Sequence, residues 1–281
     1  MPCSISRSTT RISFLLTLIP LTLSGCGTQT YEDRLAASTA YFSYRQQVDS
    51  LLESRAWKNE GITFRPPKSF SELPPPPSAP DEDSPTPPDT RQPPFLTHKL
   101  PGLVGAWQSQ LRVEIPESDV DELPAWLLIC TNHGDFRRKF DNPQIIPAAF
   151  MENLTNAVAD CTGYARSTAI EPWKFTEVRA PSGTAYVPRK DYDWILLSDP
   201  EMTFEVEGQK VRYDFRVYRY FIGQNIQFAL VTIVPSDDIL ARSSRPYDAI
   251  DMAMEQMTAT DEVPRTRSGA PAAAPISGGG F

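Results

Sequence analysis

One short stretch of the chain combines three residue types that could do chemistry together. A thiol, an imidazole and a carboxylate, those of Cys130, His133 and Asp135, lie within six residues. They could supply a nucleophile, a base and the group that orients the base. However, Cys130 and His133 are three positions apart where a predicted strand passes into a turn, and side chains there alternate between faces. A plain loop is therefore the preferred interpretation, and no catalytic residue is assigned.

The remaining candidates for chemistry lack the spacing that a site requires. The chain has only two histidines, no Cys-x-x-Cys pair and no His-Glu-x-x-His motif, so no metal site is predicted. It has neither a Gly-x-Gly-x-x-Gly fingerprint nor a Walker loop, and no cofactor is expected. The net charge of −8 argues against a nucleic-acid partner, because that binding relies on Lys and Arg to neutralise phosphates.

The elements that would position these residues belong to a globular domain over 101–262. Their pattern predicts the α+β class, with an antiparallel sheet of five or six strands and helices packed on it. Along 213–221 the alternation predicts one core face and one solvated face, and the alternative is an aromatic platform that binds carbohydrate or peptide. The expected strands are 105–115, 126–131, 193–197, 202–207, 210–221 and 226–234, and the expected helices are 147–160 and a broken helix from 236 to 257.

The order of these elements is similar to that of the Mog1/PsbP-like fold, an antiparallel sheet between helices. The matching features are Gly-Ile-Thr-Phe-Arg-Pro-Pro at 61–67, the meander over 202–234 and the closing helix. Members of that fold are mostly binding or assembly proteins. The resemblance therefore implies no active site.

Residues 1–25 have the pattern of a secretory signal peptide. Arg7 and Arg11 precede an apolar stretch over 12–23, which is too short to span a membrane. The stretch ends in Leu-Ser-Gly-Cys at 23–26, which resembles the lipobox of bacterial lipoproteins at every position. In that family the cysteine thiol receives a diacylglycerol, the leader is cut just before it and the new N-terminus is acylated. The alternative is an ordinary signal peptide, or a signal anchor, with an incidental cysteine.

The resemblance implies that Cys26 is lipidated and that the mature protein begins there. Two or three acyl chains would hold the protein to a membrane, since each buried CH₂ contributes about 0.8 kcal/mol. The expected location is the cell envelope, on the periplasmic side. Gly27 rather than aspartate follows the cysteine, which in enterobacterial lipoproteins permits transport to the outer membrane.

Export would place the remaining pair of cysteines, Cys130 and Cys161, in an oxidising compartment. One lies at a predicted strand end and the other at a predicted helix end. A bond between them would close a loop of about 30 residues and contribute roughly 3–4 kcal/mol in the chain-entropy model. A disulfide is expected, and the alternative is two buried free thiols.

Three segments flank the globular domain. Residues 26–60 hold the anchor and an amphipathic helix over 31–57, which either packs on its own domain or forms a short coiled coil. Residues 61–100 hold a short strand and a proline-rich linker, because proline favours extended polyproline II. The tail over 263–281 is rich in Ala, Pro, Gly and Ser and is expected to be disordered.

These patterns favour a lipid-anchored envelope protein that acts without catalysis. It would serve as a binding or assembly module for a protein or cell-wall partner, and it would contact the membrane through the lipid on Cys26. The alternative from another class is an envelope hydrolase that uses residues around Cys130 and His133. A third interpretation is a structural subunit whose helix over 31–57 mediates oligomers.

Overall fold

A computed structural model describes residues 25–77, 89–116, 118–163, 174–177, 191–197, 201–206 and 208–263. The expected signal peptide up to residue 24, the centre of the proline-rich linker and the tail from residue 264 lie outside these ranges. The chain divides into two compact units. One comprises residues 1–50 and 179–189, and the other comprises residues 51–178 and 190–281.

The described part of the first unit is the helix α1 (Gly25–Leu51). It begins and ends six residues earlier than the sequence predicts. No glycine or proline interrupts residues 28–51, so its backbone hydrogen bonds continue unbroken. The helix ends at Leu51 because the next residues pair with another segment. The Leu51 carbonyl accepts a hydrogen bond from the Lys68 N–H, and the Glu53 N–H donates to the Pro66 carbonyl, both at 2.9 Å.

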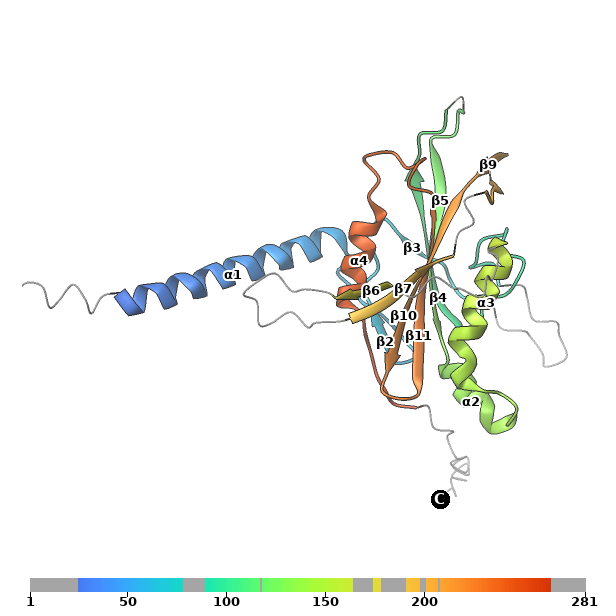
Figure 1. Cartoon of the computed structure of the whole chain (residues 1–281), viewed down its shortest axis with the longest axis horizontal. Coiled ribbons are helices and arrows are strands. Elements are labelled where there is room, and N and C mark those ends of the chain that lie inside the picture. The colour runs from blue at the N-terminus through green and yellow to red at the C-terminus, as the bar shows by residue number, and fades with distance from the viewer. Residues whose placement is uncertain are drawn as a thin grey trace, which may run out of the picture. The chain divides into compact units, whose positions relative to one another are not determined.

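The second unit is built on a seven-stranded antiparallel sheet, which confirms the α+β class (Figure 1). Six of its strands have four residues or more, and the seventh, β3, has two. In the order in which they pair, the strands are β3 (Ser71–Glu72), β4 (Leu103–Arg112), β5 (Glu122–Thr131), β11 (Ile226–Pro235), β10 (Tyr213–Ile222), β7 (Asp191–Leu196) and β6 (Lys174–Glu177).

Two smaller sheets accompany it. One has the order β1 (Trp57–Asn59), β2 (Ile62–Phe64) and β12 (Thr258–Ala259), and the other pairs β8 (Phe204–Val206) with β9 (Gln209–Val211). The expected three-strand meander over 202–234 is therefore wrong in one respect. Its middle strand is interrupted at Arg212, whose carbonyl accepts a hydrogen bond from the Ser236 N–H. As a result β8 and β9 form their own hairpin, and β7 is the second neighbour of β10.

The helices of this unit cover both faces of the large sheet. They are α2 (His133–Asp141), the short 3₁₀ helix η1 (Pro147–Ala149), α3 (Phe150–Thr162) and α4 (Pro246–Gln256). In Figure 1, α3 and α4 lie on opposite sides of the sheet. The expected loop at His133 is thus the first turn of a helix, and the final helix begins only at Pro246, with proline in its first turn.

Side-chain alternation along β10 divides the packing between the two faces. Phe215 and Val217 are fully buried in the core under α3, together with Val231 of β11. The opposite face was expected to be solvated, but Tyr218 and Tyr220 are buried there at 2% and 9% exposure. It is covered because α4 packs on it, and the Tyr220 hydroxyl donates to the Met254 carbonyl at 3.4 Å. Both faces of the sheet are therefore part of the core.

Candidate functional site

Cys130 and His133 lie in different surroundings and do not act on each other. Cys130 is fully buried in β5, and burial raises the pKa of its thiol to about 12. The charges that act on Cys130 are those of Arg91 and Asp89, whereas those that act on His133 come from Glu60 and Arg137. A thiol with so high a pKa is not a nucleophile near neutral pH. The geometry gives the hydrolase interpretation no support.

His133 instead ties the start of α2 to the turn between β1 and β2. Its Nδ1 lies 3.5 Å from Oε2 of Glu60, which also forms an ion pair with Arg137 of α2. Burial lowers the pKa of His133, and the Glu60 carboxylate opposes part of that shift. The side chain is 4% exposed, and its Nε2 has no hydrogen-bond partner among the described residues. This arrangement is a packing contact that favours a neutral imidazole.

The two cysteines expected to bond, Cys130 and Cys161, belong to the same apolar core between the sheet and α3. Both are free thiols in the structure, and the Cys161 sulfur lies 3.9 Å from the Thr97 hydroxyl oxygen. A bond between them stays a prediction. Cys26 lies in the first turn of α1.

The described residues form a surface pocket of about 890 Å³. Sequence patterns do not predict it, because its residues are spread over the end of the expected helix, the expected linker and the expected strand 105–115. We call it the Trp57 pocket. It is lined by Glu53, Arg55, Ala56, Trp57, Lys58, Pro66, Lys68, Phe70, Ser71, Glu72 and Trp107.

Backbone hydrogen bonds hold the walls of the Trp57 pocket in place. Residues 51–53 pair with residues 66–68 through the two hydrogen bonds that end α1 and an isolated bridge between Leu52 and Pro67. The Phe70 N–H donates to the Pro67 carbonyl at 2.9 Å, and the Arg65 side chain donates from Nε to the Glu53 carbonyl at 2.8 Å. The pocket is therefore built on fixed backbone rather than on long side chains.

Aromatic rings form the floor of the Trp57 pocket. Trp107 of β4 is 1% exposed, and the Trp57 ring meets it edge to face at 5.2 Å between centroids. Phe64 of β2 supports Trp107 at 5.0 Å. Gly105 permits this packing, because a Cβ there would lie 2.7 Å from the Trp57 ring. Trp107 is nearly inaccessible, so the half-buried Trp57 ring supplies the aromatic surface that a ligand could meet.

Charged side chains form the rim of the Trp57 pocket. Three are basic, Arg55, Lys58 and Lys68, and two are acidic, Glu53 and Glu72. The pocket therefore joins an aromatic floor to a rim with a small basic excess, in a chain whose net charge is −8. The lining thus combines aromatic surface with charged groups of both signs.

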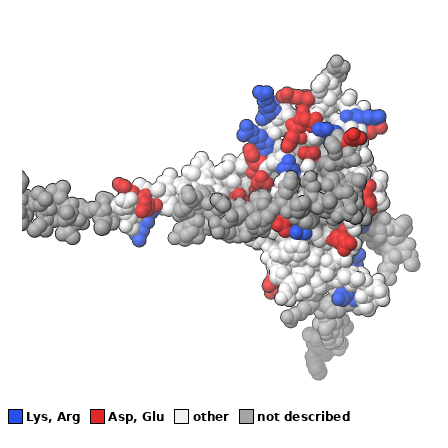
Figure 2. Space-filling model, in the orientation of Figure 1, with Lys and Arg blue, Asp and Glu red and all other residues white. Residues whose placement is uncertain are grey.

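The described residues contain no cluster of three or more His, Cys, Asp or Glu side chains with the geometry of a metal site. Among the helices within the same ranges, none combines the length and the apolar character that crossing a membrane requires. In Figure 2, acidic and basic side chains are intermixed on the face of the sheet-containing unit in view.

No family model matches the chain, and no curated protein matches it.

Proposed function

We propose that this chain is a lipid-anchored protein of the cell envelope that binds a partner without catalysis, and that the Trp57 pocket is its binding site. The observation that carries this proposal is the continuity of three features along the chain. The lipobox cysteine, Cys26, lies in the first turn of α1, and α1 ends two residues before Glu53, the first residue of the pocket.

A single uninterrupted helix follows the expected lipid anchor. At 1.5 Å per residue, its 27 residues span about 40 Å. Two or three acyl chains on Cys26 suffice for stable anchoring.

The surroundings of the candidate catalytic residues support a non-enzymatic role. Cys130 is a buried neutral thiol and His133 is enclosed between α2 and the β1–β2 turn. The Trp57 pocket is lined by neither of them. Its aromatic and charged side chains are suited to binding.

The experiment that tests this proposal is an intact mass of the protein from native membranes. We expect a chain that begins at Cys26 and carries the mass of two or three acyl chains. In detergent phase partition the wild type should enter the detergent phase, and the intact mass of Cys26→Ser should show neither acyl chains nor removal of residues 1–25. An unacylated chain that begins at Met1 would overturn the anchor.

A further inference from the structure

We propose that the Trp57 pocket binds an extended segment of a partner protein in which an aromatic or leucine side chain stands next to an acidic residue. This inference rests on the proposed role as a binding module and names the class of ligand. The apolar side chain would enter against the aromatic floor, and the acidic one would pair with Arg55 or Lys58 at the rim.

Two strands with an open edge line the pocket, and they favour a polypeptide over a small molecule. β1 is the outer strand of the order β1-β2-β12, and β3 is the outer strand of the seven-stranded sheet. Residues Trp57 and Lys58 of β1 and both residues of β3 belong to the lining. Outer strands have backbone groups available for pairing, so an added chain can gain hydrogen bonds from them.

The register of the β1–β2 hairpin identifies which backbone groups are available. Asn59 pairs with Ile62 across a two-residue turn, and Lys58 faces Thr63. In an antiparallel hairpin, the two residues that flank such a turn hydrogen-bond to each other through their backbones. The next residue, Lys58, therefore directs its N–H and C=O away from β2. Within the described residues β1 pairs with β2 alone, so no strand pairs with the outer side of Lys58. A partner segment can therefore pair with Lys58.

The charge at the rim selects an acidic residue in the partner. Arg55 and Lys58 are exposed, and neither forms an ion pair within the described residues. Glu53 and Glu72 also line the pocket, so a segment with a uniformly negative charge would be repelled there. In a segment with an acidic residue beside an apolar one, the acidic side chain can pair with Arg55 or Lys58. The apolar side chain can then contact the aromatic floor.

The volume agrees with a few side chains of a peptide. Ligand pockets commonly have about 300–1,000 Å³, and this one has about 890 Å³. The floor is already packed, because the Trp107 ring contacts both Trp57 and Phe64. A partner would therefore meet a formed surface and lose little free energy to ordering it.

The test uses a library of random dodecapeptides displayed on phage, selected against the full chain in detergent micelles. Enriched peptides are then made with a fluorescein label and titrated by fluorescence anisotropy. We expect enrichment of an aromatic residue or leucine beside aspartate or glutamate. Binding should weaken at least tenfold in Arg55→Glu and in Lys58→Glu, and replacing the acidic residue of the peptide by lysine should restore it with Lys58→Glu. Methylation of alternate backbone amides in the peptide should abolish binding.

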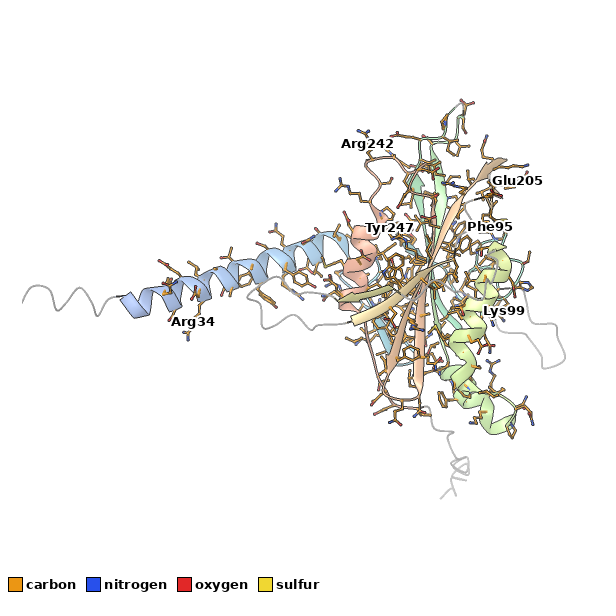
Figure 3. All side chains as sticks on the ribbon, in the orientation of Figure 1. Arg34, Phe95, Lys99, Glu205, Arg242 and Tyr247 are labelled. Atoms are coloured by element: carbon orange, nitrogen blue, oxygen red, sulfur yellow. The ribbon has the colours of Figure 1, made fainter. Side chains whose placement is uncertain are left out.

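The matched control is Arg242→Glu, which reverses an exposed basic residue outside the pocket. Figure 3 shows Arg242 on the segment before α4, with its side chain projecting away from the sheet. The three variants change exposed side chains, so circular dichroism should find the same fold in all of them. The control should bind the selected peptides as tightly as the wild type.

Four outcomes overturn the proposal. They are a selection without enrichment, enriched peptides that lack the apolar–acidic pair, binding that is indifferent to Arg55→Glu and Lys58→Glu, and equal loss in Arg242→Glu. A dimer broken by Lys58→Glu in light scattering would assign the pocket to a second copy instead. If vesicles containing phosphatidylglycerol bind the wild type and not Lys58→Glu, the pocket is a membrane-binding site instead. The mass of the anchor is measured separately, so failure of the lipid and failure of the peptide site are distinguishable.

Discussion

At the scale of single residues, the surroundings of a titratable group decide what it can do. The Cys130 thiol is surrounded by the apolar core, which disfavours the charged thiolate. His133 is enclosed near Glu60, and burial outweighs the attraction between the carboxylate and an imidazolium. Both side chains are therefore neutral near pH 7, and each contributes packing rather than proton transfer.

The first prediction concerns the reactivity of Cys130. Because burial raises its pKa to about 12, iodoacetamide at pH 8 should leave Cys130 unmodified in the folded protein and label it in 6 M guanidinium with reductant. Peptide mapping by mass spectrometry measures both states. Omitting the reductant from the denatured sample tests the bond to Cys161: labelling of both cysteines without it would show two free thiols. Rapid labelling of Cys130 in the folded protein would contradict the buried core position.

The second prediction concerns stability against pH. Burial lowers the pKa of His133 in the folded state, whereas an unfolded histidine titrates near 6.5. The contribution of His133 to stability is then complete above about pH 6.5 and falls as the pH drops from there towards the folded pKa. Urea unfolding at pH 7.5 and pH 5.5 should give a smaller difference in unfolding free energy for His133→Gln than for the wild type.

The control for this prediction is His98→Gln, which changes an exposed histidine in a loop. It should leave the difference between the two pH values as it is in the wild type. The prediction is wrong if His98→Gln removes the difference in unfolding free energy between pH 7.5 and pH 5.5 and His133→Gln keeps it.

At the scale of elements, glycines show where one backbone approaches another. Gly102 precedes β4 with φ of +65°, and a Cβ on it would lie 2.1 Å from the Thr131 carbonyl oxygen of β5. Gly134 lies in the first turn of α2, and a Cβ on it would meet nothing within 4 Å. The same substitution should therefore have opposite effects at these two positions.

The third prediction compares these two glycines. Gly102→Ala should destabilise the protein by about 2 kcal/mol or more. The strain of alanine in a left-handed backbone conformation and the clash of its Cβ with the neighbouring backbone both raise the free energy of the folded state. Gly134→Ala should stabilise it by up to about 1 kcal/mol, since glycine is the weaker helix former. Thermal unfolding followed by circular dichroism measures both. A midpoint that falls equally in the two variants would contradict the packing described at the start of β4.

At the scale of the whole molecule, the charge of the chain determines which partners it attracts. The net charge is −8, and acidic side chains are interspersed with basic ones on the face of the sheet-containing unit in Figure 2. Long-range attraction to a polyanion is therefore weak. The basic excess at the rim of the Trp57 pocket is small, so its selectivity is local.

The fourth prediction follows from this charge. The full chain in detergent should not shift double-stranded DNA in a gel at 50 mM salt, because it cannot neutralise a run of phosphates. A basic DNA-binding protein serves as the positive control in the same gel. A shift that disappears between 50 and 200 mM salt would contradict the prediction and reveal a phosphate-binding surface.

The sequence by itself determined the class of the fold and the positions of its strongest elements. Alternating apolar residues placed β10 and β11, and the apolar line of Phe150, Leu154 and Val158 placed α3, because periodicity is a local property of the chain. The resemblance of residues 23–26 to a lipobox is equally local, and the lipid anchor stays a prediction from it.

Only the tertiary structure decided how distant segments meet. The second face of β10 is buried because α4 covers it, although the arginines and tyrosines on that face predict exposure to solvent. Cys130 and His133 are close in the chain yet lie in different surroundings, because β5 places Cys130 in the core whereas His133 begins α2 beside Glu60. The Trp57 pocket joins residues 53–58, 66–72 and 107. Such contacts depend on packing between elements, which no local pattern encodes.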